Sequence, residues 1–213
     1  MLEDFSPVTL LVTTPLVLLV SDQMKANSAT EFVRMLKDNP SKYTYGSSGI
    51  GTSQHLTTLM FLNRIGAQAV HVPYKGTGQS LVDLGGGQLD FQFDNLATGL
   101  AAARRGGIAA LAVTGDARTR LAPDLPTIAE SGVPGFSTST WLGLLAPAGV
   151  PEPVREYLNS EVVAVLKSDA LQDWFATNGF TPKPTSSEGF KEFIKEETSR
   201  FSDLIDRNRI TVQ

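Results

Sequence analysis

Tyr45-Gly-Ser-Ser-Gly-Ile-Gly-Thr-Ser-Gln-His55 is a turn rich in glycine and hydroxyl groups, placed between two segments of different periodicity. Lys42–Tyr45 before it is expected to be a short strand, and Gln54–Gly66 after it carries apolar residues at helical spacing. Glycines let the backbone turn its N–H groups inward, and the free amides and positive dipole end of the following helix add to them. The segment therefore predicts a strand–turn–helix unit whose turn can bind a carboxylate or a phosphate.

Strands that end in turns recur along the next part of the chain. A predicted strand, Ala69–Pro73, leads into the turn Tyr74–Gly78, and another, Leu89–Phe93, ends at Asp94–Asn95. Further strands and helices are expected at Val8–Thr13, Leu16–Ser21, Ser28–Lys37, Gln79–Leu84, Leu96–Arg105 and Ile108–Val113. This alternation predicts an α/β fold with a mostly parallel sheet covered on both faces. Ligands of such sheets bind outside the carboxyl ends of the strands, where all three turns would lie.

The composition changes between residues 115 and 135, where prolines and glycines mark a long connection. A strand at Thr138–Leu145 follows. Two helices are then expected, Pro153–Asn178, broken near Ser168, and Ser187–Asn208. We interpret the connection as a change of domain.

The composition of the 213 residues argues against several classes of protein. A net charge of -4 without basic runs argues against a nucleic-acid or anionic-lipid partner. Without cysteine there is no disulfide or thiolate, and two histidines are too few for most metal sites, so no metal or cofactor is expected. The apolar stretch Val8–Val20 is too short to span a bilayer and follows acidic residues, so we expect a buried strand and no signal peptide.

The turn supplies two kinds of hydrogen-bond donor. Ser47, Ser48 and Thr52 carry hydroxyl groups, and Gly49 and Gly51 allow backbone amides to face a ligand. No Gly-Lys-Ser/Thr follows, which excludes a P-loop, and the glycine spacing is not that of a dinucleotide-binding turn. The alternative is a tight strand-to-helix connection that binds nothing.

Five further residues lie near the predicted turns. His55 lies one turn into the helix, where it either contacts an anion or is a structural histidine, whereas His71 lies inside a strand and is expected to pack. Tyr74 offers a phenol and Gly76 a free amide. Asp94, at a strand end, can hold a water, pair with a ligand ammonium or cap the next helix, and ligand recognition and capping stay equally open.

Enzymatic chemistry is not expected. A serine nucleophile needs a base and a third, orienting group. The Gly-Ser-Ser-Gly segment is not Gly-x-Ser-x-Gly, and neither histidine lies late in the chain. No cluster of carboxylates and histidines suggests metal catalysis.

Six motifs in order resemble one family, the tripartite tricarboxylate transporter receptors, also called Bug solute-binding proteins. The resemblance covers essentially the whole chain. The motifs are Tyr45-Gly-Ser-Ser-Gly-Ile-Gly-Thr-Ser-Gln-His-Leu56, Val70-His-Val-Pro-Tyr-Lys-Gly76, Phe93-Asp-Asn95, Leu111-Ala-Val-Thr114, Leu125-Pro-Thr-Ile-Ala-Glu-Ser-Gly132 and Trp141-Leu-Gly-Leu-Leu-Ala-Pro-Ala-Gly149.

The resemblance implies a periplasmic binding protein, type II-like, with two α/β lobes and a carboxylic acid ligand held by backbone amides, hydroxyls and ordered waters. It places one ligand loop at Gly46–Thr52, with Tyr74, Gly76 and Asp94 nearby. The implied function is periplasmic capture of a mono-, di- or tricarboxylate, or a carboxylated aromatic or amino acid, for a tripartite tricarboxylate transporter. The implied partners are that ligand and the membrane subunits of the transporter.

The chain departs from the family at its beginning, because roughly the first third of the usual mature protein is not represented. We therefore expect a first lobe that is incomplete, with residues 1–16 as a hinge or remnant of it, 17–125 as a complete second lobe, and 126–213 as the returning part of the first. Apolar faces of the last helix, including Phe190, Phe193 and Ile194, would then be exposed and favour a homo-oligomer. Two alternatives to a receptor stay open: an anion-binding enzyme that uses the Gly-Ser turn, and a non-binding interaction or sensory module.

Overall fold

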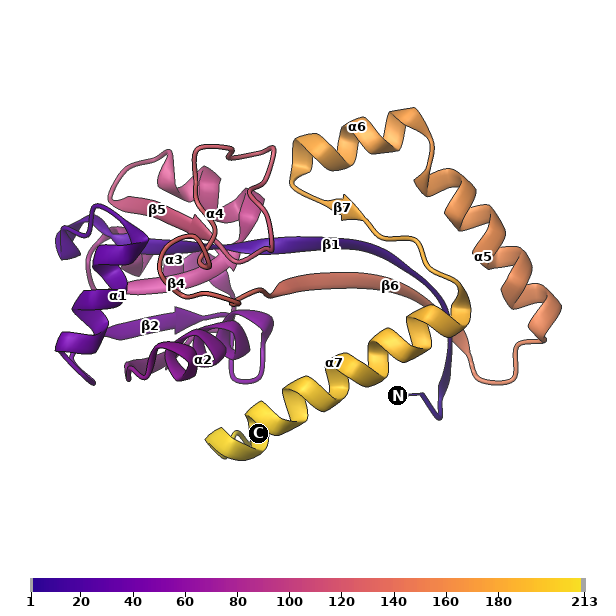
Figure 1. The fold of residues 1–213 in the computed structure, drawn as a ribbon, viewed down its shortest axis with the longest axis horizontal. Helices are drawn as coiled ribbons and strands as arrows, with labels where there is room; N and C mark the ends of the chain where they lie inside the picture. The colour runs from indigo at the N-terminus through magenta and orange to yellow at the C-terminus, as the bar shows by residue number, and fades with distance from the viewer. Residues whose placement is uncertain (1, 212–213) are drawn as a thin grey trace. The chain divides into compact units, whose positions relative to one another are not determined.

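One long strand, β1 (Phe5–Ser21), runs through the first part of the chain (Figure 1). The sequence predicts two extended segments on either side of Pro15, and this division was wrong. Proline fixes φ near −65°, which an extended chain tolerates. Pro15 stands where the strand changes partners, because Thr13 pairs with β7 (Thr181–Pro182) and Leu16 pairs with β4 (Phe91–Asn95).

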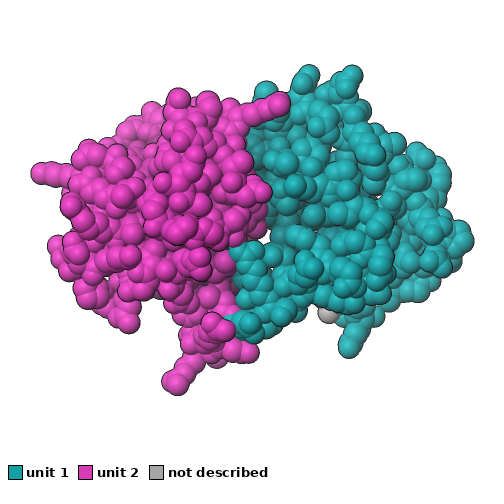
Figure 2. Space-filling model, in the orientation of Figure 1, with its two compact units in different colours: residues 1–14, 140–203 teal, residues 15–139, 204–213 magenta. Residues whose placement is uncertain are grey.

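The computed structural model describes residues 2–211 and separates them into two compact units, drawn in two colours in Figure 2. Unit 1 holds the chain up to Thr14 together with Thr140–Asp203, and unit 2 holds Pro15–Ser139 and the chain from Leu204. Besides its share of β1, unit 2 contains η1 (Asp22–Met24), α1 (Ala29–Asp38), β2 (Thr44–Ser47), α2 (Ser53–Ile65), β3 (Val70–Pro73), α3 (Thr77–Gly85), β4, α4 (Leu96–Ala103) and β5 (Ile108–Val113).

The sheet of unit 2 has the strand order β3-β2-β4-β1-β5. β2 is parallel to β3 and to β4, with Tyr45 opposite both His71 and Phe91. β1 is antiparallel to β4 and to β5, so β4 and β5 share one direction. The predicted α/β fold is confirmed, and the sheet is mixed: β2, β3, β4 and β5 share one direction, whereas β1 runs antiparallel to its two neighbours.

Both faces of this sheet are buried, as the continuous apolar run of β1 requires. Side chains alternate across a strand. Leu16, Leu18 and Val20 therefore pack with α1 and α2, whereas Val17 and Leu19 pack with α3 and α4. Strands that are buried on both faces have near-continuous apolar sequences of this kind.

The helices begin and end at local signals. Ser28 Oγ accepts a hydrogen bond from the Glu31 amide (3.1 Å), and the Glu31 carboxylate accepts one from the Asn27 amide (2.9 Å), which starts α1. Gly66, at φ 67°, ends α2 in the left-handed conformation.

The connection after β5 belongs to unit 2. The Val113 amide donates to Pro126 O, and the Thr138 amide donates to Thr114 O. Ile128, Val133 and Phe136 are buried in the same core as α1 and α2; the compact unit consequently continues to Ser139, past the expected lobe boundary at residue 125. The division of the whole protein into two lobes stays a prediction.

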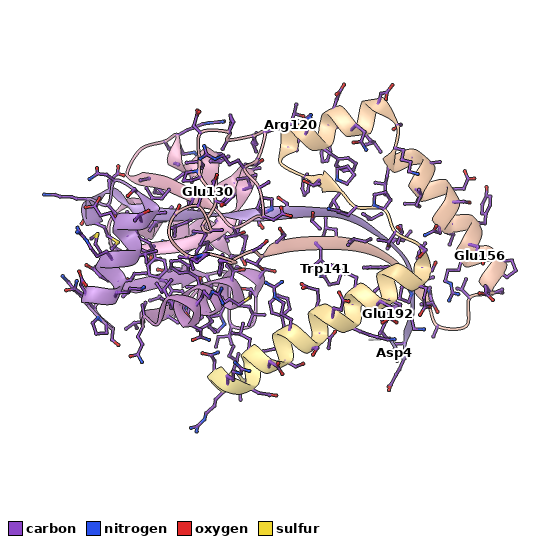
Figure 3. All side chains as sticks on the ribbon, viewed as in Figure 1. Asp4, Arg120, Glu130, Trp141, Glu156 and Glu192 are labelled. Atoms are coloured by element: carbon purple, nitrogen blue, oxygen red, sulfur yellow. The ribbon has the colours of Figure 1, made fainter. Side chains whose placement is uncertain are left out.

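Unit 1 contains nearly all of β6 (Ser139–Pro147), which pairs with β1, together with α5 (Glu152–Leu166), α6 (Asp169–Asn178) and β7. It also contains α7 (Ser187–Asn208) up to Asp203. Phe190 and Ile194 of α7 are 0% and 2% exposed and pack with Leu10. Trp141, labelled in Figure 3, meets Phe190 edge to face at 5.8 Å. The expectation that Phe190 and Ile194 are exposed was therefore wrong, because β1 and β6 cover them.

Candidate anion-binding site

Glycines shape the turn between β2 and α2. Gly49 and Gly51 have φ of 137° and 78°, which side-chain-bearing residues rarely adopt. A Cβ on Gly46 would stand 2.8 Å from both Gln92 Oε1 and Leu89 Cδ1. The turn thus needs glycine for its conformation at two positions and for close packing at a third.

Hydroxyl groups of the turn are bonded within the protein. Ser47 Oγ donates to Gly49 O (3.0 Å) and accepts from the Gly49 amide (3.2 Å), and Thr52 Oγ1 also donates to Gly49 O (2.8 Å). Ser48 Oγ donates to Gln54 Oε1 (2.8 Å). These hydroxyls hold the shape of the turn, a role that the sequence did not predict for them.

The start of α2 is left uncapped. Thr52 occupies the N-cap position but makes no side-chain cap bond, because its hydroxyl points to Gly49 O. The first intrahelical bond runs from the Leu56 amide to Thr52 O (2.9 Å). Within residues 2–211 the first-turn amides at Ser53 and Gln54 have no side-chain acceptor, and such amides, with the helix dipole, bind anions.

The two histidines stack against each other beside the turn. Their ring centroids are 4.0 Å apart at an interplanar angle of 8°, and Tyr45 stacks on His71 at 4.8 Å. His55 Nδ1 accepts from the Gly51 amide (3.1 Å), and His71 Nε2 lies 2.7 Å from Ser47 Oγ. The packing expected of His71 is therefore present, and His55 holds the turn through its bond to the Gly51 amide.

Burial keeps both imidazoles neutral near pH 7. Desolvation lowers the pKa of His55, and desolvation together with the neighbouring His55 lowers the pKa of His71 to about 4. Neutral rings offer hydrogen bonds but no positive charge. An anion at this turn would depend on amides and dipoles.

The turn after β3 is tied to the first one. The Tyr74 amide donates to Ser47 O (3.0 Å), and the Tyr74 hydroxyl donates to Asp83 Oδ2 (2.7 Å). Burial, then the bond and charge of Asp83, raise the pKa of Tyr74 to about 12. Gly76, at φ 151°, is the N-cap of α3 and lacks a side-chain cap. The phenol is thus engaged, whereas backbone amides at this turn are available.

Asp94 is the most deeply buried acid near these turns. Its side chain is 0% exposed, Oδ1 accepts from the Asn95 amide (2.8 Å), and Oδ2 has no hydrogen-bond partner among the described residues. Burial raises the pKa of Asp94 to about 6, opposed by the Asn95 amide and the nearby Gln54 side chain. Asp94 does not cap α4, because its bond goes to the N-cap residue itself and α4 has no side-chain cap.

Gln54 is a site residue that the sequence analysis missed. It is 6% exposed and joins Ser48 to the neighbourhood of Asp94. The available signal was its helical spacing with Thr58 and Phe61, both buried, which places a polar amide on the apolar face of α2.

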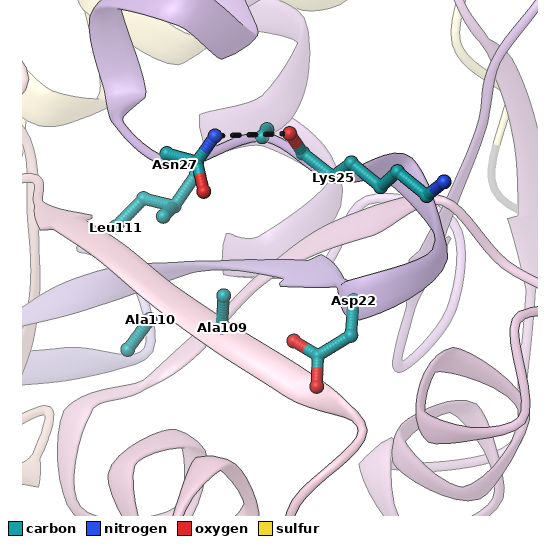
Figure 4. Close-up of a pocket in the computed structure, with 7 residues that line it drawn as sticks. Asp22, Lys25, Asn27, Ala109, Ala110 and Leu111 are labelled. Atoms are coloured by element: carbon teal, nitrogen blue, oxygen red, sulfur yellow. Dashed lines mark hydrogen bonds between the residues drawn. The ribbon is translucent and has the colours of Figure 1, made fainter.

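A separate surface hollow of about 690 Å³ lies at the opposite edge of the sheet (Figure 4). It is lined by Asp22, Lys25 and Ala109 among others, near the end of β1 where Ser21 pairs with Ile108. None of the predicted site residues lines it. The carboxyl ends of β2, β3 and β4, where Ser47, Pro73 and Asn95 end the strands, carry the candidate site instead.

Residues 2–211 hold neither a cluster of metal ligands nor a helix that could span a membrane. No three or more His, Cys, Asp or Glu side chains there gather as metal ligands could. Nor does any helix in this part of the chain combine the length and the apolar character needed to cross a bilayer.

Glycine turns and an uncapped helix start at the carboxyl ends of the strands of an α/β sheet have the geometry of a binding site for a small anionic solute. Residues 1–210 match the family described as "Tripartite tricarboxylate transporter family receptor", and the chain belongs to this family. The family is one of receptors, which bind a solute, and not of enzymes. The recognition made from six sequence motifs is confirmed.

A curated relative shows the extent of the match. Protein BugT of Bordetella pertussis (strain Tohama I) is 32% identical over 204 residues, which are 96% of this chain and 63% of BugT. The chain therefore spans less than two thirds of the length of this relative.

Two solved structures confirm the fold. "R. palustris Rpa4515 with adipate" has a TM-score of 0.87 and 32% identity, over 98% of this chain and 70% of that one. "MatC (Rpa3494) from Rhodopseudomonas palustris with bound malate" has a TM-score of 0.80 and 29% identity, over 94% and 69%. Both are described with a small dicarboxylate bound.

Proposed function

We propose that the whole protein is a periplasmic receptor that captures a small carboxylate and presents it to the membrane subunits of a tripartite tricarboxylate transporter. The observation that carries the proposal is the uncapped start of α2 behind a turn shaped by Gly49 and Gly51. Membership of the receptor family supports it, as do the adipate and malate in the two similar structures. The ligand class extends to mono-, di- and tricarboxylates and to carboxylated aromatic or amino acids.

The proposed contacts divide into two groups. The first-turn amides of α2, at Ser53 and Gln54, and the amide of Gly76 donate to the ligand carboxylate. The Gly49 and Gly51 amides are bonded to Ser47 Oγ and His55 Nδ1, so these two glycines shape the turn. A second group shapes and lines the site, comprising the side chains of Ser47, Ser48, Thr52, His55, Tyr74 and Asp94.

One geometric feature favours an enzyme, and its chemistry argues against that reading. Ser47 Oγ lies 2.7 Å from His71 Nε2, as a nucleophile and its base would. The Ser47 hydroxyl, however, donates to Gly49 O and is 1% exposed. A pKa of about 4 makes His71 a weak base, and no carboxylate in residues 2–211 bonds to its Nδ1. Ser47 and His71 therefore support the turn.

Calorimetry of the chain against acetate, adipate, malate, citrate and aspartate tests the proposal. Binding of at least one, with the ligand recovered unchanged, is expected. Turnover of any ligand would favour the anion-binding enzyme, and no heat with the whole panel would favour the non-binding module. Light scattering on the same sample tests whether the chain self-associates although Phe190 and Ile194 are buried.

A pair of glycine variants tests the location. Gly51→Ala and Gly66→Ala both place alanine at positive φ (78° and 67°), with a similar cost in stability of about 1–2 kcal/mol. Gly66 lies at the far end of α2, about 20 Å from the turn at 1.5 Å per residue. Gly51→Ala should lower carboxylate affinity at least about tenfold, and Gly66→Ala should leave it unchanged. Equal losses would place the site elsewhere.

A further inference from the structure

Ser48, Gln54 and Asp94 form a polar chain beneath the turn, each contributed by a different element or loop. Ser48 Oγ donates to Gln54 Oε1 (2.8 Å), and the Gln54 amide lies close enough to Asp94 to lower its pKa. The Gln54–Asp94 approach is not a formed hydrogen bond, because Asp94 Oδ2 has no partner among residues 2–211. An unpaired buried oxygen of this kind needs a proton or a donor.

The charge of Asp94 sets the direction of the hydrogen bonds that run from Ser48 through Gln54. An ionised carboxylate only accepts hydrogen bonds, so it favours the Gln54 NH₂ group on its side and Oε1 towards Ser48. The Ser48 hydrogen then points to Gln54 Oε1, consistent with the 2.8 Å separation of the two oxygens, and the hydroxyl presents only lone pairs outward. Lone pairs and a nearby buried negative charge both oppose a ligand carboxylate.

Protonation of Asp94 reverses this direction. A protonated carboxyl can donate to Gln54 Oε1, which turns the Gln54 NH₂ group towards Ser48. Ser48 Oγ then accepts from Gln54, and its own hydrogen is released to donate to a ligand. Neutralising Asp94 also removes the repulsion between two carboxylates in one site.

We propose, on the basis of the receptor function proposed above, that Asp94 acts through Gln54 on the hydroxyl of Ser48, so that a ligand carboxylate binds with uptake of one proton at Asp94. Gln54 is then a positioning residue, and Asp94 determines which ligands are accepted. When Asp94 is ionised, it selects a ligand that brings its own hydroxyl or ammonium donor to Oδ2.

Asp94 is the group in this neighbourhood that titrates near neutral pH. Its pKa is about 6 and no charged neighbour contributes to the shift. From α2, His55 faces the turn, and from β3, His71 does; burial lowers the pKa of both imidazoles, so neither carries a charge above pH 7.

The other elements packed on β4 bring no further charge to Asp94. On the α3 side, Asp83 is bonded to the Tyr74 hydroxyl. Val17 of β1 lies opposite Asp94, and Gly99 of α4 packs near its Cβ. Proton uptake in this pH range would therefore be assigned to Asp94.

The test is calorimetry of the chain with adipate as the probe, between pH 5.5 and 8, in buffers of different ionisation enthalpy. Close to one proton per adipate should be taken up at pH 7.5, and affinity should fall about tenfold per pH unit above pH 6. Asp94→Asn fixes the amide as a donor to Gln54 Oε1, so it should bind without proton uptake and with affinity independent of pH. Gln54→Leu removes the link between Asp94 and Ser48 and should at least halve the dependence of adipate affinity on pH.

Asp83→Asn is the matched control, because it changes a carboxyl that is bonded to Tyr74 in the same unit and should keep the wild-type pH profile. Comparison between variants cancels the titration of adipate itself. Binding without proton uptake, or an unchanged pH profile in Asp94→Asn, would overturn this inference and leave the receptor function standing. Absence of adipate binding at every pH, in every variant and with the wider carboxylate panel, would overturn both.

Discussion

Replacing Asp94 by asparagine should stabilise the fold above pH 6. The pKa of Asp94 rises from its ordinary 3.8 to about 6, chiefly because the side chain is 0% exposed. Each pKa unit corresponds to about 1.4 kcal/mol, so the ionised carboxylate costs the folded state about 3 kcal/mol. Asparagine keeps the shape and removes this charge.

The sign of the effect follows from proton binding. The folded state holds the Asp94 proton more tightly than the unfolded state, so wild-type stability falls as pH rises from about 4 to 6 and then stays level. The gain from Asp94→Asn should be absent below pH 4, grow through that window and reach about 3 kcal/mol at pH 8.

Urea unfolding at pH 4, 6 and 8 measures this difference, with the exposed Asp116→Asn as the control. Asp116→Asn should change the free energy of unfolding little at any of the three values. A gain in Asp94→Asn that is the same at pH 4 and pH 8, or a loss at pH 8, would refute the reasoning.

Three predictions, two about packing and one about a helix cap, can be checked by urea or thermal unfolding. Gly99→Ala should cost about 1–3 kcal/mol, because the new methyl would overlap the Val17 side chain, whereas Gly78→Ala, with open space around it, should cost nothing; equal effects would contradict the packing of α4. Ser28→Ala should lower the free energy of unfolding by about 1 kcal/mol through loss of the bond from the Glu31 amide. An unchanged free energy of unfolding would show that this cap does not stabilise the fold. Phe61→Ala should cost about 3–5 kcal/mol, as a fully buried ring in the core, and a loss below 1 kcal/mol would not fit that burial.

Local signals made much of unit 2 predictable. Ser28 and Gly66 mark helix ends through bonds to their own neighbours, so a few residues of sequence contain the whole cause. The direction of β1 was not predictable in this way, because it depends on partners such as Asp94 and Val113 far along the chain. The same holds for α7, whose apolar face is covered by Leu10 of β1.

The candidate site divides similarly. The glycine pattern predicted the turn, because positive φ at Gly49 and Gly51 is a property of single residues. The partners of the polar groups were not predictable, since the Tyr74 hydroxyl bonds Asp83 nine residues later and Ser48 bonds a glutamine inside α2. The sequence shows which side chains can donate hydrogen bonds. It does not show that the folded protein uses several of these donors for bonds within itself.

The central claim, that the turn and the start of α2 bind a ligand carboxylate, is tested most directly by following backbone amide signals by NMR while adipate is added. The account predicts saturable shifts concentrated at Gly49, Gly51 and the first-turn amides of Ser53 and Gln54. Shifts concentrated around the hollow at Lys25 and its neighbours, or no saturable shift with any carboxylate, would contradict it.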